Sequence, residues 1–292
     1  MRYLLRAFAA IVLSAFLAIV ALRTIPIHVY DGFESAHLSH LRWTNRRFEP
    51  GAVVSEESVV RSGRRAVAIT VRSGDRPEAA SESGAATERD ELMESWWLFS
   101  RRGRTYVYSF SLYLPENLPQ TPERLVIAQW RQLCEGSPCV PDNPILALRY
   151  EIGRLQVTRN DEHGKTLLYQ GDEDVRGKWL DFRFVTRWDA TRDGVLDATL
   201  LGRPIVHYEG PTLYQPGPGH PGNALIYFKT GLYRDALHQP AWTMYVDEYR
   251  KRSVSCERLS LKTGCFLGPP SREVEPDRIV TRAALSLVWH SP

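Results

Sequence analysis

The chain has 292 residues, of which 24% are charged, and its formal net charge at pH 7 is +3. This length fits one soluble domain with a tail and is sufficient for a large hydrophobic core. A net charge this small gives no global attraction for nucleic acid, so we expect no nucleic-acid partner. Affinity for anions would have to come from local clusters of arginine.

Residues 1–24 have the pattern of an export segment. Arg2 and Arg6 precede an apolar run from Ala7 to Leu22, which is shorter than the ~20 residues of a spanning helix. No small-residue cleavage site follows, so a cleaved signal peptide and an uncleaved signal anchor both stay open. Either form predicts a periplasmic or secreted domain, and the second form tethers it to the inner membrane.

The four cysteines form two pairs that are close in sequence, Cys134 with Cys139 and Cys256 with Cys265. Neither pair has C-x-x-C or zinc-type spacing. Four reduced thiols are the alternative to two short-loop disulfides. The export segment favours the disulfides, because exported proteins meet an oxidising compartment.

Beyond the leader, apolar and polar residues alternate with a period of two, which is typical of half-buried strands. The clearest examples are residues 106–114 and 179–188, and turn residues separate many further short strands. We therefore predict an all-β fold, a two-sheet antiparallel jelly roll of the concanavalin-like sandwich type. The predicted domain spans residues 28–252, and an irregular C-terminal extension spans residues 253–292.

The stretch "YFKTGLYRD" raises a question about its two faces. In residues 225–233 the even positions are mostly apolar and predict the core face, while Tyr227, Lys229 and Tyr233 share the other face around Gly231. A glycine inside a strand often marks a place where a ligand approaches the backbone. The alternative is an exposed strand that Tyr and Lys merely cover.

Two other stretches carry polar residues on a predicted non-core face. Gln129 and Arg131 share one face of residues 124–131, and Arg89 lies beside Glu91, which alone would indicate only a surface ion pair. If these strands are neighbours, they form a cationic groove. Trp96 and Trp97 follow closely, and we expect core packing for them rather than stacking on sugars.

In chain order the three stretches read "RDEL" (89–92), "QWR" (129–131) and "YFKTGLY" (227–233). They resemble the R-[ST]-E-L-R, Q-I-H and Y-F-K-A-G-x-Y motifs of jelly-roll polysaccharide lyases, which include alginate lyases, glucuronan lyases and heparin-lyase-I-like proteins. "DGFES" near the start and "YVDEYRK" near the end resemble the heparin-lyase-I-like group. The departures from the motifs that matter for the chemistry are Arg131, which replaces the motif histidine, and Met93, which replaces the second arginine.

The resemblance implies a lyase that cleaves an acidic, uronate-containing polysaccharide by β-elimination. It implies that Arg89, Gln129 and Arg131 neutralise the uronate carboxylate and that Tyr233 is the catalytic acid and base. The implied substrate-binding residues are Lys229, Tyr227, Glu91 and Arg234. Because a tyrosine has an ordinary pKa of about 10, it acts as a base only beside cations. Arg89 or Arg131 on a neighbouring strand suits this role better than Lys229, which lies ~13 Å along the same strand.

The resemblance implies no required cofactor and, in related folds, a structural calcium ion near the paired terminal strands. Glu34 and Asp247 are the candidate ligands, with ordinary surface acids as the alternative. We expect a monomer. Two other functions stay open: a non-catalytic carbohydrate-binding jelly roll that has lost its histidine, and a glycoside hydrolase of similar fold, which needs two facing carboxylates.

Overall fold

The computed structural model of the protein describes residues 26–77, 87–134, 143–217, 219–220, 222, 224–235 and 240–254. The predicted leader, Cys139, Cys256, Cys265 and nearly all of the predicted C-terminal extension therefore lie outside the described residues. Within those ranges, no helix has the length and apolar character that crossing a membrane requires.

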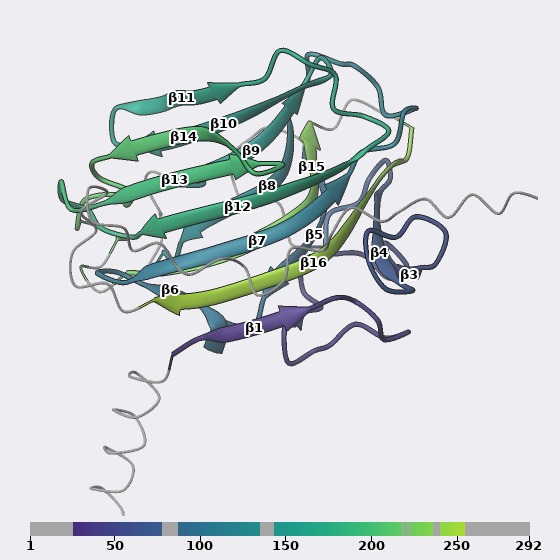
Figure 1. The fold of residues 1–292 in the computed structure, drawn as a ribbon, viewed down its shortest axis with the longest axis horizontal. Coiled ribbons are helices and arrows are strands. Elements are labelled where there is room, and N and C mark those ends of the chain that lie inside the picture. Colours follow the sequence, from purple (N-terminus) through teal and green to yellow (C-terminus); the bar gives the residue numbers. More distant parts are fainter. Residues whose placement is uncertain are drawn as a thin grey trace, which may run out of the picture. The chain divides into compact units, whose positions relative to one another are not determined.

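The described chain is a sandwich of two antiparallel sheets with eight strands each, which confirms the predicted all-β jelly roll (Figure 1). The first sheet has the order β14-β13-β12-β7-β16-β4-β3, with β1 paired to β16. Its strands are β1 (His28–Asp31), β3 (Val53–Glu56), β4 (Ala66–Val71), β7 (Thr105–Tyr113), β12 (Trp179–Arg187), β13 (Val195–Leu200), β14 (Arg203–Glu209) and β16 (Trp242–Val254).

The second sheet has the order β11-β10-β9-β8-β15-β5-β2, with β6 paired to β15. Its strands are β2 (Trp43–Thr44), β5 (Thr87–Glu94), β6 (Ser100–Arg101), β8 (Leu125–Gln132), β9 (Leu146–Glu151), β10 (Arg154–Asp161), β11 (Gly164–Gln170) and β15 (Leu225–Asp235). A single turn of 3₁₀ helix, η1 (Trp96–Leu98), connects β5 to β6.

Aromatic side chains fill the space between the sheets. Phe110 of β7 lies 5.5 Å from Phe182 and 5.2 Å from Phe228 between ring centroids, and Trp130 of β8 lies 5.0 Å from Phe228. All four are buried. Burial of each such side chain stabilises the fold by about 1.5–3 kcal/mol relative to exposure. Because the aromatic residues of β7 and β12 recur at every second position, this gain determines which face of each strand turns inward.

A buried ion pair also joins the two sheets. Lys251 of β16 lies 2.9 Å from both carboxylate oxygens of Glu94 of β5, and the backbone N–H of Phe228 donates to Glu94 at 3.1 Å. The hydroxyl of Tyr249 donates to the same carboxylate. Burial lowers the pKa of Lys251, while burial and the charge of Glu94 raise the pKa of Tyr249 well above its ordinary value.

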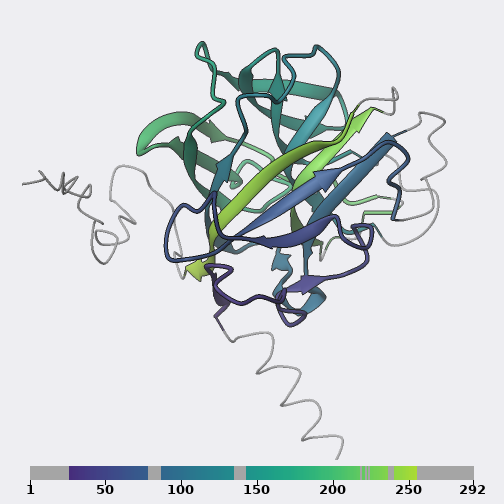
Figure 2. The ribbon, with the colours of Figure 1, turned by 90° about the vertical axis from the view of Figure 1, so that its right-hand side faces the viewer.

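The two ends of the domain meet on neighbouring strands. Residues His28 to Asp31 pair antiparallel with Tyr249 to Arg252, and Figure 2 shows the long yellow-green β16 running beside β4. Strand β16 continues to Val254, two residues beyond the predicted domain boundary at 252.

Candidate active site

Strands β5, β15 and β8 are neighbours in the second sheet, so the three sequence motifs lie side by side. On the β5 side, Tyr233 is opposite Arg89 and Gly231 is opposite Glu91. On the β8 side, Lys229 is opposite Gln129 and Tyr227 is opposite Arg131. Residues directly opposite each other in an antiparallel pair project from the same side of the sheet. This side, here called the groove face, therefore carries Arg89, Glu91, Gln129, Arg131, Tyr227, Lys229 and Tyr233.

Gly231 has a structural role that differs from the ligand approach suggested by the sequence. Its φ is +144°, and a Cβ atom built there would lie 2.2 Å from the carbonyl oxygen of Asp90 and 2.7 Å from Cα of Glu91. The β15–β8 register shifts between Thr230 and Tyr233, which marks a β-bulge. Glycine is thus required by the close packing of β15 on β5, and the register of this pair runs without a shift from Lys229 to Asp235, so Tyr233 stays on the same face as Lys229.

The ring of Tyr233 contacts two guanidinium groups. Cζ of Arg89 lies 4.3 Å from the ring centroid, and Cζ of Arg124 lies 4.8 Å from it. Because β15 lies between β5 and β8, these arginines approach from opposite flanks of the strand. Arg124 also forms an ion pair with Asp235. Arg149 of β9 adds positive charge: burial lowers its pKa, and it interacts electrostatically with Arg124 and Tyr233.

Lys229 and Glu91 form an ion pair beneath this surface rather than open substrate contacts. Lys229 Nζ lies 2.6 Å from Glu91 Oε2, and both side chains are only 1% exposed. The amide of Gln129, also buried, donates to Glu91. Burial lowers the pKa of Lys229 to about 7. Burial alone would raise the pKa of Glu91, but the charges of Lys229 and Arg89 outweigh it and lower that pKa. The two residues therefore support the groove face from below.

The other end of the groove face holds Tyr227 and Arg131. Tyr227 stacks on Phe99 with ring centroids 5.2 Å apart. Arg131 is opposite Tyr227, six residues along β15 from Tyr233, or roughly 20 Å of extended strand. Arg89 and Arg124, not Arg131, are thus the cations placed at the Tyr233 ring. Arg47, which the sequence did not single out, interacts electrostatically with Tyr227 and Arg131, and burial lowers its pKa.

Arg234 is not available to a substrate, so its assignment as a substrate-binding residue is wrong. It projects from the face of β15 opposite to Tyr233 and is completely buried. Its Nε lies 2.8 Å from Oε2 of Glu88, and its guanidinium lies 4.4 Å from the ring of Trp242. A period-two strand sends neighbouring residues to opposite faces, and this residue belongs to the interior.

The candidate calcium ligands both contact one loop. Glu34 accepts the backbone N–H of Arg64 at 3.1 Å, and Asp247 accepts those of Arg61 at 3.0 Å and Ser62 at 3.1 Å. Burial raises the pKa of Asp247 to about 6. Among the residues with described positions, no group of three or more His, Cys, Asp or Glu side chains gathers. The carboxylates bind N–H donors here, and a calcium site at them stays a prediction.

The structure also places Cys134, Trp96 and Trp97, which the sequence had singled out. Cys134 follows β8 and is disulfide-bonded; because Cys139, Cys256 and Cys265 are outside the described ranges, the two predicted pairings remain predictions. Trp96 is 79% exposed and Trp97 is 50% exposed, so the expectation that both pack in the core is wrong.

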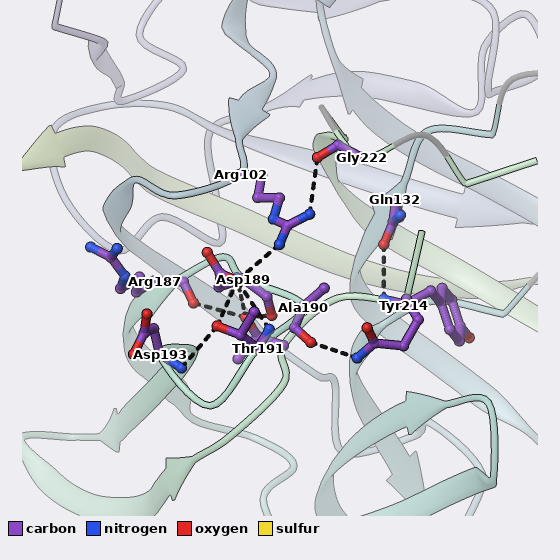
Figure 3. Close-up of polar contacts among 11 residues, drawn as sticks. Arg102, Gln132, Arg187, Asp189, Ala190, Thr191, Asp193, Tyr214 and Gly222 are labelled. Atoms are coloured by element: carbon purple, nitrogen blue, oxygen red, sulfur yellow. Dashed lines mark hydrogen bonds and ion pairs between the residues drawn. The ribbon is translucent and has the colours of Figure 1, made fainter. Parts of the chain in front are cut away.

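A polar network fixes the chain that leads into β15 (Figure 3). Arg102 donates to the carbonyl of Gly222 at 3.1 Å and to Asp189 at 3.4 Å, and Asp189 also accepts the backbone N–H of Thr191 at 3.0 Å. At the end of β8, the side-chain oxygen of Gln132 accepts the N–H of Tyr214 at 3.0 Å. These contacts come from separate turns and hold the start of the strand that carries Tyr227 and Tyr233.

The described sandwich is a jelly roll with a cationic, tyrosine-bearing sheet face, and a comparison with known families gives its class. A family model described as polysaccharide lyase matches residues 30–250. The chain belongs to this family and is a polysaccharide lyase, which confirms the resemblance predicted from the motifs.

Solved structures show the same fold. An endo-β-1,4-glucuronan lyase from the fungus Trichoderma reesei is 17% identical over 76% of this chain and 94% of its own, with a TM-score of 0.59. A family 7 alginate lyase, A1-II′, in complex with product is 12% identical over 70% of this chain and 84% of its own, with a TM-score of 0.50. A comparison with curated proteins gave no match.

Proposed function

We propose that this polysaccharide lyase cleaves an acidic, uronate-containing glycan by β-elimination, with Tyr233 as both base and acid. The observation that carries the proposal is the position of the Tyr233 ring between Arg89 and Arg124, 4.3 Å and 4.8 Å from their guanidinium carbons. The solved relatives, which include a glucuronan lyase and an alginate lyase, support a uronate substrate by analogy.

The reaction needs positive charge beside the uronate carboxylate and beside the tyrosine that acts as the base. The base removes the proton on C5 beside the carboxylate, the electron pair forms the C4=C5 double bond, and the C4–O bond breaks as the leaving oxygen takes a proton. Charge accumulates on the carboxylate during the first step, so preorganised cations and N–H donors stabilise the transition state. Arg89 contributes beside Tyr233, and a tyrosine that has accepted the C5 proton then donates it to the leaving oxygen.

Arginines supply most of the donors for the carboxylates of the glycan. Gln129 is buried and donates to Glu91, so it supports the Lys229–Glu91 ion pair rather than contacting the glycan. Arg47 and Arg131 lie toward the Tyr227 end of the groove face, and Arg124 and Arg149 lie toward the Tyr233 end. Cations spread along the groove face match a polymer that carries a charge on successive sugars.

We further propose that the enzyme acts outside the cytoplasm as a monomer, in the periplasm or secreted, and released or tethered through residues 1–24. The sequence of the leader supports export. N-terminal sequencing of the protein from an exported fraction distinguishes cleavage from tethering, and a purely cytosolic protein would contradict both forms.

Two other functions lose support. Membership of a lyase family favours catalysis over carbohydrate binding alone. A glycoside hydrolase needs two facing, accessible carboxylates, whereas Glu91 is held in a buried ion pair with Lys229.

The test is incubation with a panel of polyuronates while the ultraviolet absorbance of 4,5-unsaturated uronate ends is followed. We expect absorbance with at least one polymer and none with Tyr233→Phe, which should still bind that polymer. Binding without absorbance would indicate a carbohydrate-binding protein, and new reducing ends without absorbance would indicate hydrolysis.

A further inference from the structure

The 3₁₀ turn η1 exposes two adjacent indole rings. Trp96 is 79% exposed and Trp97 is 50% exposed, whereas the next two residues, Leu98 and Phe99, are buried. Tryptophan carries a large apolar surface and usually buries most of it. Two neighbouring tryptophans that remain in water therefore form a surface available to a partner.

The turn holds these rings on a fixed support. The backbone N–H of Ser95 donates to the carbonyl of Arg42 at 2.9 Å, and its hydroxyl donates to the carbonyl of His40 at 3.2 Å. On the other side, Lys251 donates to the carbonyl of Leu98 at 2.5 Å. A surface whose backbone is already ordered loses little conformational entropy when it binds.

The turn is continuous with the groove face. Phe99, directly after η1, stacks on Tyr227 at an interplanar angle of 29°. Tyr227 and its neighbour Arg131 are at the end of the groove face farthest from Tyr233. Arg101 of β6, which pairs with Leu225 at the start of β15, adds a second cation at this end. A polymer bound over Tyr233 and extended along β15 leads toward the exposed indoles.

We propose that Trp96 and Trp97 form a distal subsite in which sugar rings of the acidic glycan stack on the indoles, with Arg101 and Arg131 binding carboxylates beside them. The apolar faces of pyranose rings, formed by their C–H groups, match the flat aromatic surface, and the adjacent cations select a charged glycan over a neutral one. The subsite rests on the proposed function, because its occupant is the polymer cleaved at Tyr233, several sugars away.

The experiment compares wild type with Trp96→Ala, Trp97→Ala and the double variant. Initial rates are measured on the polyuronate that wild type cleaves and on short oligomers of it that do not extend from Tyr233 to η1. An aromatic contact worth about 0.5–1.5 kcal/mol predicts a rise in KM for the polymer of roughly 2- to 13-fold. We expect unchanged kcat and unchanged kinetics on the short oligomers, and Trp97→Tyr should retain most of the wild-type affinity.

Val54→Ala is the matched control, because Val54 is 48% exposed and lies on β3 of the other sheet. It should leave every constant unchanged. A double variant with wild-type KM on the polymer would overturn the subsite, and so would an equal loss on polymer and short oligomers.

If wild type releases no unsaturated ends from any polyuronate, the proposed function fails separately, and affinity electrophoresis in gels that contain each polymer tests the tryptophans. Retardation of wild type but not of the double variant would support the surface as a glycan-binding site. Equal mobility of the two proteins would overturn it.

Discussion

Replacement of Arg124 by glutamine tests the arrangement around Tyr233 directly. Glutamine keeps a polar side chain but removes the positive charge that lies 4.8 Å from the Tyr233 ring centroid. Arg89 remains on the other flank of β15 at 4.3 Å. The variant should therefore retain the fold and part of the electrostatic support, and its elimination rate should fall moderately rather than disappear.

The magnitude follows from the exposure of the arginine. Cation–π contacts contribute about 0.5–1 kcal/mol at exposed sites and about 2 kcal/mol or more when desolvated. The Arg124 side chain is 35% exposed, so we take about 1 kcal/mol, which lowers kcat about 5-fold. Asp235, its partner, is exposed to a similar degree, and water replaces the lost ion pair at small cost. Arg89→Gln should reduce the rate further, because Arg89 is closer to the ring and is also proposed to neutralise the carboxylate.

The assay is the initial rate of formation of unsaturated uronate ends, with kcat and KM determined separately. Arg176→Gln is the control, because Arg176 pairs with Asp174 in the connection between β11 and β12, outside the strands that carry the motifs. A wild-type kcat for Arg124→Gln would refute the proposed support of Tyr233. A loss confined to KM would show that Arg124 binds substrate instead.

Three further predictions concern stability. Lys251→Ala should destabilise the fold by about 3–5 kcal/mol in urea unfolding, because Glu94 stays buried without its cation. The double variant Glu94→Gln/Lys251→Met should recover most of this loss, and a small loss of stability in Lys251→Ala would contradict the reasoning. Burial raises the pKa of Asp90 to about 8, so between pH ~4 and ~8 the native state binds more protons than the unfolded chain, and the free energy of unfolding falls as pH rises, by at most about 1.4 kcal/mol per pH unit. Asp90→Asn should flatten the dependence of Tm on pH, and an unchanged slope would exclude Asp90 as its source. If Glu34 and Asp247 bind calcium, EDTA should lower Tm and added calcium restore it in wild type but not in Glu34→Gln, and a Tm insensitive to both would remove the site.

Alternation within single strands predicted much of the site. Which residues share a face depends only on the two-residue period, so Arg89, Gln129, Tyr227 and Tyr233 emerge together once their strands are neighbours. The resemblance of the ordered motifs to those of the lyases predicted that these strands are neighbours, and the observed register confirms it.

The same rule failed where a strand departs from regular geometry. Counted from Trp130, the period places Arg124 on the core side, but the register of β8 against β9 shifts between Val126 and Ala128. Such a bulge reverses the face of every residue before it, and Val126 is indeed opposite Tyr233. Arg149 was missed for a different reason: nothing local to its strand indicates that β9 pairs with β8.

The sequence also did not predict how deeply each side chain of the groove face is buried. Lys229 shares a face with Tyr233, and from the pattern alone it is as accessible. Lys229 is nevertheless buried and pairs with Glu91 of one adjacent strand, which Gln129 of the other adjacent strand also contacts. Arg47, which precedes β5 by some forty residues, is close enough to contribute to lowering the pKa of Lys229. Accessibility on a sheet face is thus a property of packing between distant segments, and period-two patterning carries no information about it.

Arginine at position 131 also has consequences for the proposed chemistry. Arg131 lies among other cations, Arg47 and Lys229, and contributes to lowering the pKa of both. A guanidinium stays protonated throughout the physiological range and cannot accept the C5 proton as an imidazole does. Tyr233, which we propose as both base and acid, would then act on the sugar from one side. One group that both removes the C5 proton and protonates the leaving oxygen requires the two to lie on the same side of the ring, so the arginine that departs from the family motif favours syn elimination.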